Sequence, residues 1–287
     1  MKKLFIVNPT SGQGLSLEII KRLEKKCKEN NEDYKIVYTE KKDDATKIAT
    51  YYKDFGCRIY SVGGDGTLNE IVNGLIGGTS FLTVIPAGSG NDFYKTISNY
   101  EEKIFDIDVG KVNDKYFINS ASIGLDAIIG ENVSLMKKIH IPRSQIYNAS
   151  IIYTLINFKP IEIKINDVYE KITLLAVTNG QYYGSGFRIT PDASINDGYL
   201  NLCMAKKLNK LQIPPMLLKL IKENHYEDKH VITKRIKNLK ITSNKDLICG
   251  IDGELLKGKD FDFNIIEGGI KYNNENNYDI KRLIMSR

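Results

Sequence analysis

Three glycines, a carboxylate and a hydroxyl are concentrated in residues 61–70, which read SVGGDGTLNE. Glycine has no Cβ, so backbone N–H groups in such a stretch can approach an oxyanion closely. A helix predicted to begin at about Thr67 or Leu68 would direct its positive end to the same point. The pattern therefore predicts a nucleotide phosphate site that Asp65 reaches through a metal ion or a water. The alternative is a tight strand-to-helix turn whose glycines serve packing.

A second polar loop, residues 8–14, follows the first predicted strand and reads NPTSGQG. The side chains of Asn8 and Ser11, together with the glycine backbone, could line a triphosphate. The same residues also make a competent turn and helix start. Thr39 follows the second predicted strand on the same rim, where its hydroxyl could contact a purine or a ribose, although it could equally cap a turn.

A third loop, residues 86–93, repeats the arrangement of strand, glycine-rich turn and helix start, with the sequence PAGSGNDF. It directs a second set of backbone donors at the same pocket, with the hydroxyl of Ser89 among them. Asp92 has two interpretations. Its carboxylate could cap the following helix, or it could orient waters on a metal ion.

Acidic residues stand at two glycine turns much later in the chain, in PDASINDGY at 191–199 and IDGE at 251–254. Phosphoryl transfer needs a divalent cation, an acceptor hydroxyl held in line, and a carboxylate that takes the proton of that hydroxyl. These turns could supply the carboxylates. Ordinary hairpins explain each one singly, because Asp197-Gly198 and Asp252-Gly253 are common turn dipeptides.

Other chemistries have few candidate residues. The chain has three histidines and no Gly-x-Ser-x-Gly, His-Glu-x-x-His or Walker-type phosphate motif. Its four cysteines are scattered without metal-like spacing, which indicates a reducing cytosol. We therefore expect neither a hydrolase triad nor a zinc site.

The coarse element order indicates two kinds of architecture. Strand-like runs at 4–7, 34–38, 58–62 and 81–85 alternate with helical patterns at 17–28, 45–53 and 69–75. This alternation predicts an α/β domain, a doubly wound parallel sheet over residues 1–105, with its loops gathered at the carboxyl ends of the strands.

From about residue 105 the pattern changes to short β-branched runs separated by turns, typical of an antiparallel β-sandwich over 106–270. The predicted strands are 107–112, 115–123, 161–165, 172–177, 200–204, 238–242 and 261–266. Helices are expected over 136–158 and 211–223. The strand-like piece 269–272 and the tail to 287 could rejoin either domain.

Positive charge is unevenly distributed. Residues 206–240 contain ten Lys or Arg against three acids, a local excess of +7 beside a whole-chain charge of +6. The apolar stretch 213–221 within this region favours docking on an anionic membrane surface. The alternatives are a nucleic acid, solubility alone, or a core-facing helix with solvated lysines. We find no predicted transmembrane helix and no signal peptide.

Taken together, the five motifs resemble the diacylglycerol kinase catalytic-domain family, and the resemblance spans nearly the whole chain. The motifs are Asn8-Pro9 with Ser11-Gly12, Gly63-Gly64-Asp65-Gly66-Thr67, residues 86–93, Asp197-Gly198 and Asp252-Gly253-Glu254. Ser89 stands where many relatives carry threonine, which keeps the hydroxyl.

The resemblance implies an active site in the cleft between the α/β domain and the sandwich. ATP would donate its γ-phosphate to a lipid hydroxyl, with Asp252 as general base and Glu254 beside it. The residues implied to hold the nucleotide are Asn8, Ser11, Thr39, Gly64, Asp65, Gly66, Thr67 and Ser89. A structural Mg²⁺ would lie at Asp197 and the carbonyls of Ser194 and Tyr199, and Asp65 and Asp92 would join a water and carboxylate network reaching the phosphates.

The resemblance also implies a cytoplasmic, peripherally membrane-associated lipid kinase without a nucleic-acid partner, with diacylglycerol as the first candidate acceptor. Phosphatidylglycerol, undecaprenol and sphingoid bases are alternatives. An NAD kinase shares Gly-Gly-Asp-Gly-Thr, but its usual Gly-x-Leu-Gly-Phe-Leu-Thr loop is missing here. A binding module without activity is a further alternative, against which the retained Asp65, Asp252 and Glu254 argue. Exposed sandwich edges make a homodimer plausible.

Overall fold

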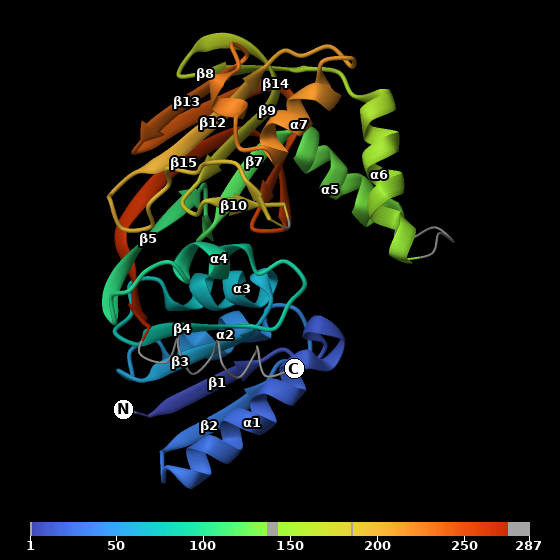
Figure 1. Ribbon diagram of the computed structural model, residues 1–287. Helices are drawn as coiled ribbons and strands as arrows, with labels where there is room; N and C mark the ends of the chain where they lie inside the picture. Colours follow the sequence, from blue (N-terminus) through green and yellow to red (C-terminus); the bar gives the residue numbers. More distant parts are fainter. Residues whose placement is uncertain (1, 137–142, 185, 275–287) are drawn as a thin grey trace.

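The computed structural model describes residues 2–136, 143–184 and 186–274. An α/β part and a β-rich part stack along one long axis, with the α/β part at the bottom of Figure 1 and the β-rich part at the top. Helices α5 and α6 project beside the β-rich part. The predicted combination of a parallel α/β sheet and an antiparallel sandwich is confirmed.

Four parallel strands form the centre of the α/β part, in the order β2-β1-β3-β4. They are β1 (Lys3–Val7), β2 (Tyr34–Tyr38), β3 (Arg58–Gly63) and β4 (Phe81–Pro86). All four strands lie close to their predicted positions. Their carboxyl ends therefore meet at one edge, where the loops that follow them converge.

Helices cover both faces of this sheet. Helix α1 (Leu15–Glu29) packs on the face to which Phe5 and Val7 point. Helices α2 (Asp44–Tyr52) and α3 (Asp65–Leu75) pack on the opposite face, with Leu4 and Ile6. Successive side chains of a strand point to opposite faces, so the run of apolar residues in β1 serves both layers.

Short elements complete this part of the chain. The 3-10 helix η1 (Ser11–Gly14) precedes α1, and α4 (Asp92–Ile97) follows the third glycine loop. Helix α3 begins at Asp65, two or three residues earlier than the sequence predicts. The first turn of α3 is therefore built from the glycine motif itself.

The β-rich part is a set of antiparallel pairings around β14 and β9. Its strands are β5 (Ile104–Val112), β6 (Lys115–Phe117), β7 (Ser120–Gly124), β8 (Ile161–Ile165), β9 (Val168–Thr178), β12 (Leu200–Lys206), β13 (Val231–Ile236), β14 (Asn238–Ile251) and β15 (Glu254–Asn273). A separate pair joins β10 (Tyr182–Tyr183) and β11 (Phe187–Arg188). The predicted strand 115–123 is two strands, and β13 was not predicted.

Three helices and one short turn lie beside these strands. They are α5 (Leu125–Met136), α6 (Arg143–Asn157), α7 (Ile213–Ile221) and η2 (His225–Glu227). The sequence predicts one helix over 136–158, whereas the structure has α5 before it and α6 within it, and residues 137–142 lie outside the described part. The pattern of α5 is weak because Asn132 interrupts its apolar stripe.

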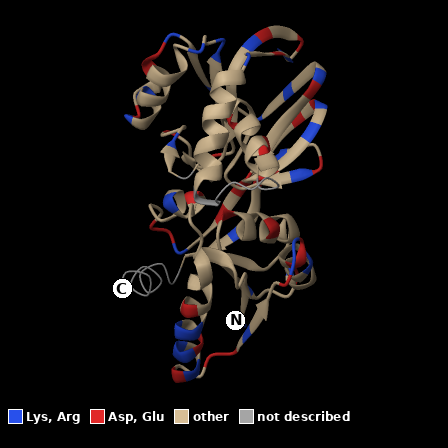
Figure 2. Ribbon diagram, turned by 90° about the vertical axis from the view of Figure 1, so that its right-hand side faces the viewer, with Lys and Arg blue, Asp and Glu red and all other residues tan. Residues whose placement is uncertain are grey.

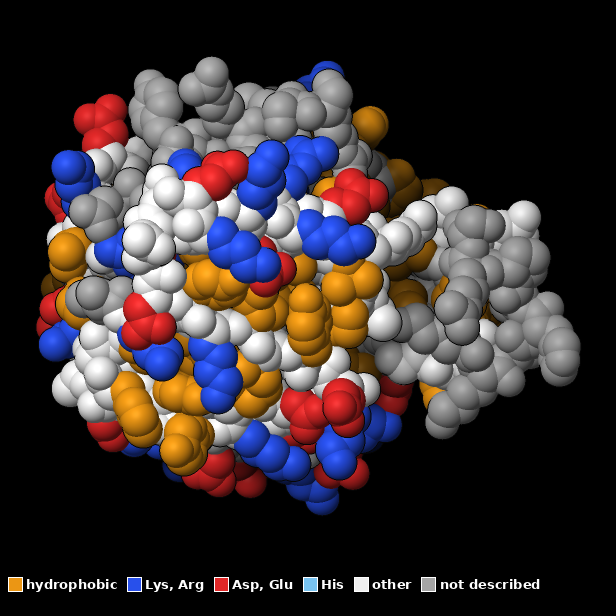
Figure 3. Space-filling model, turned by 90° about the horizontal axis from the view of Figure 1, so that it is seen from below, with side chains coloured by type: hydrophobic (Ala, Val, Ile, Leu, Met, Phe, Trp, Pro, Cys, Tyr) orange, Lys and Arg blue, Asp and Glu red, His pale blue; other side chains and the backbone are white. Residues whose placement is uncertain are grey.

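Charged side chains are unevenly distributed among the helices (Figure 2). Helix α1 carries many charged side chains, among them the pairs Lys25–Glu29 and Lys28–Glu24, whereas the helices facing the viewer in the upper half of Figure 2 are mostly uncharged. Seen from below, basic and acidic side chains alternate over the described surface (Figure 3). Within the described residues, every helix is too short or too polar to span a bilayer.

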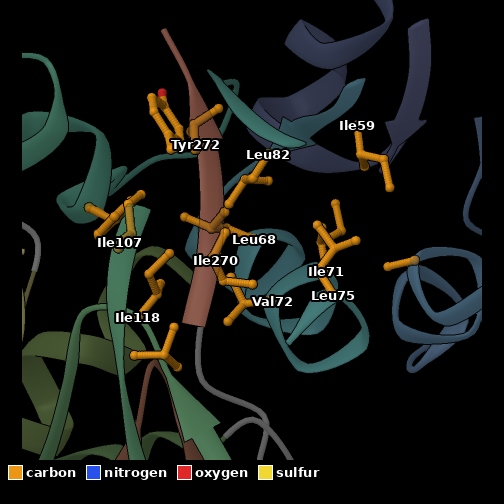
Figure 4. Close-up of a cluster of buried hydrophobic side chains, with 14 of the residues drawn as sticks. Ile59, Leu68, Ile71, Val72, Leu75, Leu82, Ile107, Ile118, Ile270 and Tyr272 are labelled. Carbon is orange, nitrogen blue, oxygen red and sulfur yellow. The ribbon is translucent and has the colours of Figure 1, made fainter. Parts of the chain in front are cut away.

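One hydrophobic core joins the two parts (Figure 4). Ile270 and Tyr272 at the end of β15 pack between Ile107 and Ile118 on one side and the α3 residues Leu68, Ile71, Val72 and Leu75 on the other. Lys271 and Tyr272 pair in parallel with Phe81 and Leu82 of β4. The strand-like piece 269–272 thus joins the α/β sheet, while residues 275–287 of the tail lie outside the described part.

Candidate active site: a polar cleft that meets an apolar pocket

A cleft of about 1120 Å³ opens at the carboxyl edge of the parallel sheet. The four loops that follow β1, β2, β3 and β4 line one side, and the turn between β14 and β15 lines the other. Of the residues predicted to bind nucleotide or to catalyse, the cleft is lined by Asn8, Ser11, Thr39, Gly64, Asp65, Gly66, Thr67, Ser89, Asp252 and Glu254. Residues far apart in the sequence are thus brought to one cavity.

Two glycine loops touch each other backbone to backbone. A Cβ on Gly88 would lie 2.4 Å from the Cα of Gly64, which no side chain can tolerate. The contact is continued by the amide of Ala87, which donates to the carbonyl of Gly63 at 2.8 Å. The glycines at Gly64 and Gly88 therefore have a packing role, as the alternative interpretation held, and this packing also leaves the backbone bare on the side of the cleft.

Side chains fix the loop after β1 against the glycine motif. The Asn8 amide Nδ2 donates to Thr67 Oγ1 at 3.2 Å, and Asn8 Oδ1 accepts from the backbone N–H of Thr10 at 3.1 Å. Thr67 is buried in the first turn of α3. Asn8 thus has a definite structural role, and its position in the wall of the cleft also allows contact with a ligand.

Asp252 occupies the tip of a two-residue hairpin between β14 and β15. Asp252 and Gly253 both have positive φ, 43° and 90°, as a tight Asp-Gly hairpin turn requires. The hairpin projects its carboxylate toward three consecutive backbone amides before and in β7. Asp252 Oδ1 accepts from Ser120 N at 2.7 Å, and Oδ2 accepts from Ile118 N at 2.8 Å.

Two weaker donors complete the surroundings of this carboxylate. Asn69 Nδ2 lies 3.1 Å from Oδ2, and the amide of Asn119 lies 3.2 and 3.3 Å from the two oxygens. Burial nevertheless dominates and raises the pKa of Asp252 to about 6, against these hydrogen bonds, which lower it. A carboxylate with a pKa near the working pH is well matched to accepting a proton.

Asp65 in the wall of the cleft has a second acid, Asp92, close to it. Burial raises the pKa of Asp65, and the negative charge of Asp92 raises it further. Lys95 Nζ lies 2.9 Å from Asp92 Oδ1 and offsets part of that charge. Asn91, and not Asp92, occupies the N-cap position of α4. Two close carboxylates are a reasonable place for the waters of a hard cation.

A second cavity of about 450 Å³ adjoins the first and is largely apolar. Helices α5, α6 and α7 supply Leu125, Ala127, Ile129, Tyr147, Ile151, Leu155, Leu217 and Leu220 to its wall, and Leu174, Phe187, Ile189 and Leu255 add to it. It shares four lining residues with the first cleft: Asp65, Asp252, Gly253 and Glu254. A polar cleft and an apolar pocket thus meet at the acidic hairpin.

Three linked polar side chains, Ser122, Asp126 and Tyr183, are among the polar residues in the wall of this pocket. The hydroxyl of Ser122 donates to Asp126 Oδ2 in a short hydrogen bond and lies 3.1 Å from the hydroxyl of Tyr183. Burial raises the pKa of Asp126 to about 6. An ionised Asp126 carboxylate can only accept hydrogen bonds, whereas the hydroxyls of Ser122 and Tyr183 can both donate and accept them. The three linked side chains are therefore suited to contact the polar end of a bound molecule.

The residues predicted to hold a structural Mg²⁺, which are Asp197, Ser194 and Tyr199, line neither cavity. Asp197 Oδ2 accepts from Arg235 Nη2 at 2.6 Å, and Asp197 Oδ1 accepts from the amide of Tyr199 at 3.0 Å. The guanidinium of Arg235 also lies over the ring of Tyr199. Carboxylate and carbonyl oxygens, including those of Ser194 and Tyr199, are the donors that Mg²⁺ prefers. Arg235 occupies one oxygen of the Asp197 carboxylate, so an Mg²⁺ bound at that oxygen would have to displace the guanidinium.

Several lining residues were missed from the sequence. Lys42, Glu70, Ser122, Asp126 and Tyr183 lie at the two cavities. Apart from Glu70, which ends the stretch 61–70, none of them belongs to a glycine motif or to a distinctive spacing, so only the fold brings them together. Among the described residues, no group of three or more His, Cys, Asp or Glu side chains is arranged to hold a metal ion.

Two family models match the chain. Residues 2–112 match the diacylglycerol kinase catalytic domain, and residues 119–268 match the YegS C-terminal NAD kinase beta sandwich-like domain. A diacylglycerol kinase of Bacillus subtilis (strain 168) is 28% identical over 88% of this chain and 90% of its own length. One of Staphylococcus aureus (strain Newman) is 31% identical over 87% of this chain and 84% of its own length.

The structure has solved counterparts as well. A crystal structure from Bacillus anthracis strain Sterne, provisionally named a diacylglycerol kinase, has a TM-score of 0.74 and 25% identity over 95% of this chain and 96% of its own. Fold, cavities and relatives together define this molecule as a lipid kinase. The chain belongs to the diacylglycerol kinase family.

Proposed function

We propose that the chain transfers the γ-phosphate of ATP to the hydroxyl of a lipid, with diacylglycerol as the acceptor and phosphatidic acid as the product. The observation that carries the proposal is the meeting of the polar cleft and the apolar pocket at Asp65, Asp252, Gly253 and Glu254. ATP would occupy the cleft and the acyl chains the pocket, so the two reacting groups would approach each other at the hairpin.

Asp252 is the proposed general base. Taking the proton of the acceptor hydroxyl as the P–O bond forms is typically worth ~10²–10⁴-fold in rate. Its carboxylate already accepts from four donors, so the lipid hydroxyl must replace one of them. The donors at 3.1 to 3.3 Å, Asn69 Nδ2 and Asn119 N, are the weakest and the first to be exchanged. Glu254 stands beside it at the start of β15.

Nucleotide binding is assigned to Asn8, Ser11, Thr39, Gly64, Asp65, Gly66, Thr67 and Ser89, all of which line the cleft. Mg²⁺ bound with ATP would offset the charge of the phosphates. Asp65 and Asp92 are the residues proposed to hold its waters. A further Mg²⁺ at Asp197 and the carbonyls of Ser194 and Tyr199 remains part of the proposal, with the release of Arg235 as its condition. The proposed division is 1–105, joined by the end of β15, and 106–270.

We also propose peripheral association with a membrane, through the outer faces of α6 and α7. The exposed side chains of these helices include Ile152, Tyr153, Ile156, Leu218 and Ile221. Their inner faces line the apolar pocket, so a lipid could enter between them without crossing water. The basic region 206–240 contributes Lys210 and Lys222 here, whereas Arg235 of β13 is paired with Asp197, and Lys237, between β13 and β14, is paired with Glu267.

A phosphorylation assay with radiolabelled ATP tests the proposal. Diacylglycerol should become labelled, in preference to phosphatidylglycerol, undecaprenol, a sphingoid base and NAD presented in parallel. Labelling of another lipid corrects the acceptor only, and labelling of NAD replaces the function. Binding of ATP and lipid without transfer would identify a binding module.

Membrane association is tested by co-sedimentation with vesicles that contain anionic lipid. Binding should weaken when Leu218 and Ile221 are both changed to Glu, because the exposed apolar area is lost. Binding that is indifferent to this change, to anionic lipid and to salt would contradict the assigned surface.

A further inference from the structure

Acidic side chains outnumber basic ones around the nucleotide cleft. Among the described residues that line it, the acids are Glu40, Asp65, Glu70, Asp252 and Glu254, and the cations are Lys41 and Lys42. A polyphosphate entering this cleft would meet a negative surface. The two lysines are therefore the side chains able to offset its charge from the protein's side.

Lys42 is held by an acid across the cleft. Its Nζ lies 2.7 Å from Oε1 of Glu254. Lys42 belongs to the turn between β2 and α2 of the α/β part, and Glu254 begins β15 after the Asp252-Gly253 hairpin. The ion pair thus bridges the two walls of the cleft. The hydrogen bond to Glu254 raises the pKa of Lys42, so the side chain is a cation at neutral pH.

This ion pair is open to exchange. The side chain of Lys42 is 68% exposed and that of Glu254 is 33% exposed, and ion pairs in such surroundings contribute little to stability. A polyphosphate carries several negative charges and offers many acceptor oxygens to the ammonium. Lys42 also sits on a flexible side chain that can turn toward the phosphates without movement of the backbone.

We propose that Lys42 is a phosphate-binding residue that Glu254 holds in the nucleotide-free enzyme, and that nucleotide binding transfers its ammonium group from Glu254 to the polyphosphate. The inference rests on the proposed binding of nucleotide in this cleft. Glu254 lines the apolar pocket as well as the cleft. The exchange therefore leaves a free carboxylate next to Asp252 at the moment when the nucleotide is in place, which links the two cavities.

Calorimetric titration of the full chain with a non-hydrolysable ATP analogue, without lipid, tests the exchange. Lys42→Met should weaken binding by about tenfold, because one charge-assisted contact is lost. Glu254→Gln should tighten binding by roughly threefold, because the lysine no longer has to leave a partner. In the Lys42→Met background, Glu254→Gln should tighten binding less than it does in the unaltered protein, because Glu254 then holds no lysine and only its repulsion of the phosphates is removed.

Lys171→Met is the matched control. Lys171 forms an exposed pair with Glu162, 2.6 Å apart, on strands outside the cleft, and its loss should leave nucleotide affinity unchanged. The exchange is overturned if Glu254→Gln does not tighten binding, or if the effects of the two changes simply add. If the unaltered protein binds no ATP analogue, the proposed function itself fails, which is a distinguishable result.

Discussion

The nucleotide cleft and the apolar pocket are built in different ways. The cleft is lined by loops whose backbones come close together, as at Gly64 and Gly88, and each loop directly follows a strand. The pocket is lined by side chains from α5, α6 and α7, which contact one another only after the chain has folded. The first surface depends on glycine and turn chemistry, whereas the second depends on which helix faces meet.

Removal of the proposed base should lower activity more than any other change to the two cavities, because Asp252 lies where they meet. We expect Asp252→Asn to lower kcat by ~10²–10⁴-fold, since no proton acceptor remains at the hydroxyl. Nucleotide affinity should stay nearly unchanged. Substantial remaining turnover would rule out Asp252 as the base.

The Asp252→Asn variant also needs a control for folding. The amide introduced by Asp252→Asn would place an NH₂ group among donors that now point at a carboxylate, including Ser120 N and Ile118 N. Some loss of stability is therefore expected, and thermal unfolding must be measured beside the kinetics. Preserved ATP-analogue binding separates a chemical defect from unfolding.

A charged side chain in the wall of the pocket should impair use of the lipid and leave ATP binding unchanged. Its effect should be smaller than that of Asp252→Asn. Ile151 of α6 lines the pocket, and Ile151→Glu would place a carboxylate where acyl chains are proposed to lie. We expect kcat/KM for a short-chain, water-soluble diacylglycerol to fall by about tenfold or more, with ATP affinity unchanged. Ile152→Glu, on the exposed face, is the control and should leave this soluble-substrate assay unaffected.

The sequence could predict much of the cleft and little of the pocket. Asp65, Asn8 and Asp252 could be assigned because each stands in a local motif whose turn geometry is readable. Asp126 and Ser122 could not, because their meeting with Tyr183 depends on how β7, α5 and β10 pack. Helix α5 and strand β13 were missed for the same reason, since neither has a clear periodic pattern of its own.

The dependence of activity on pH sharpens the role of the hairpin. Burial raises the pKa of Asp252 to about 6, and a base must be ionised to act. Activity should therefore be full above about pH 7 and fall by about tenfold per pH unit below about pH 6. The same acidic limb should persist in Asp126→Asn. Its disappearance in that variant would assign the limb to Asp126 instead.

The smallest expected effect concerns stability at the pocket. Burial raises the pKa of Asp126 to about 6 in the folded chain, so an ionised Asp126 at higher pH lowers the free energy of unfolding. This loss is recovered as the pH falls toward about 4, where the carboxyl of the unfolded chain also becomes protonated. Asp126→Asn should raise the melting temperature at about pH 8 by about 2 °C, corresponding to ~1 kcal/mol. At about pH 5 the difference should shrink, and a variant equally stabilised at both pH values would contradict the cause.

Strand β15 runs unbroken for 20 residues and serves both parts of the molecule. Its beginning carries Glu254 at the cleft, its middle pairs with β14 and β5, and its end inserts Ile270 and Tyr272 into the core beneath α3. A gene fragment that stops at residue 112 would encode every loop at the carboxyl edge of the parallel sheet. It would lack the end of β15, which completes the hydrophobic core beneath α3. Dissecting this enzyme into separately expressed halves would therefore require circular permutation, with the final stretch of β15 moved to the amino-terminal piece.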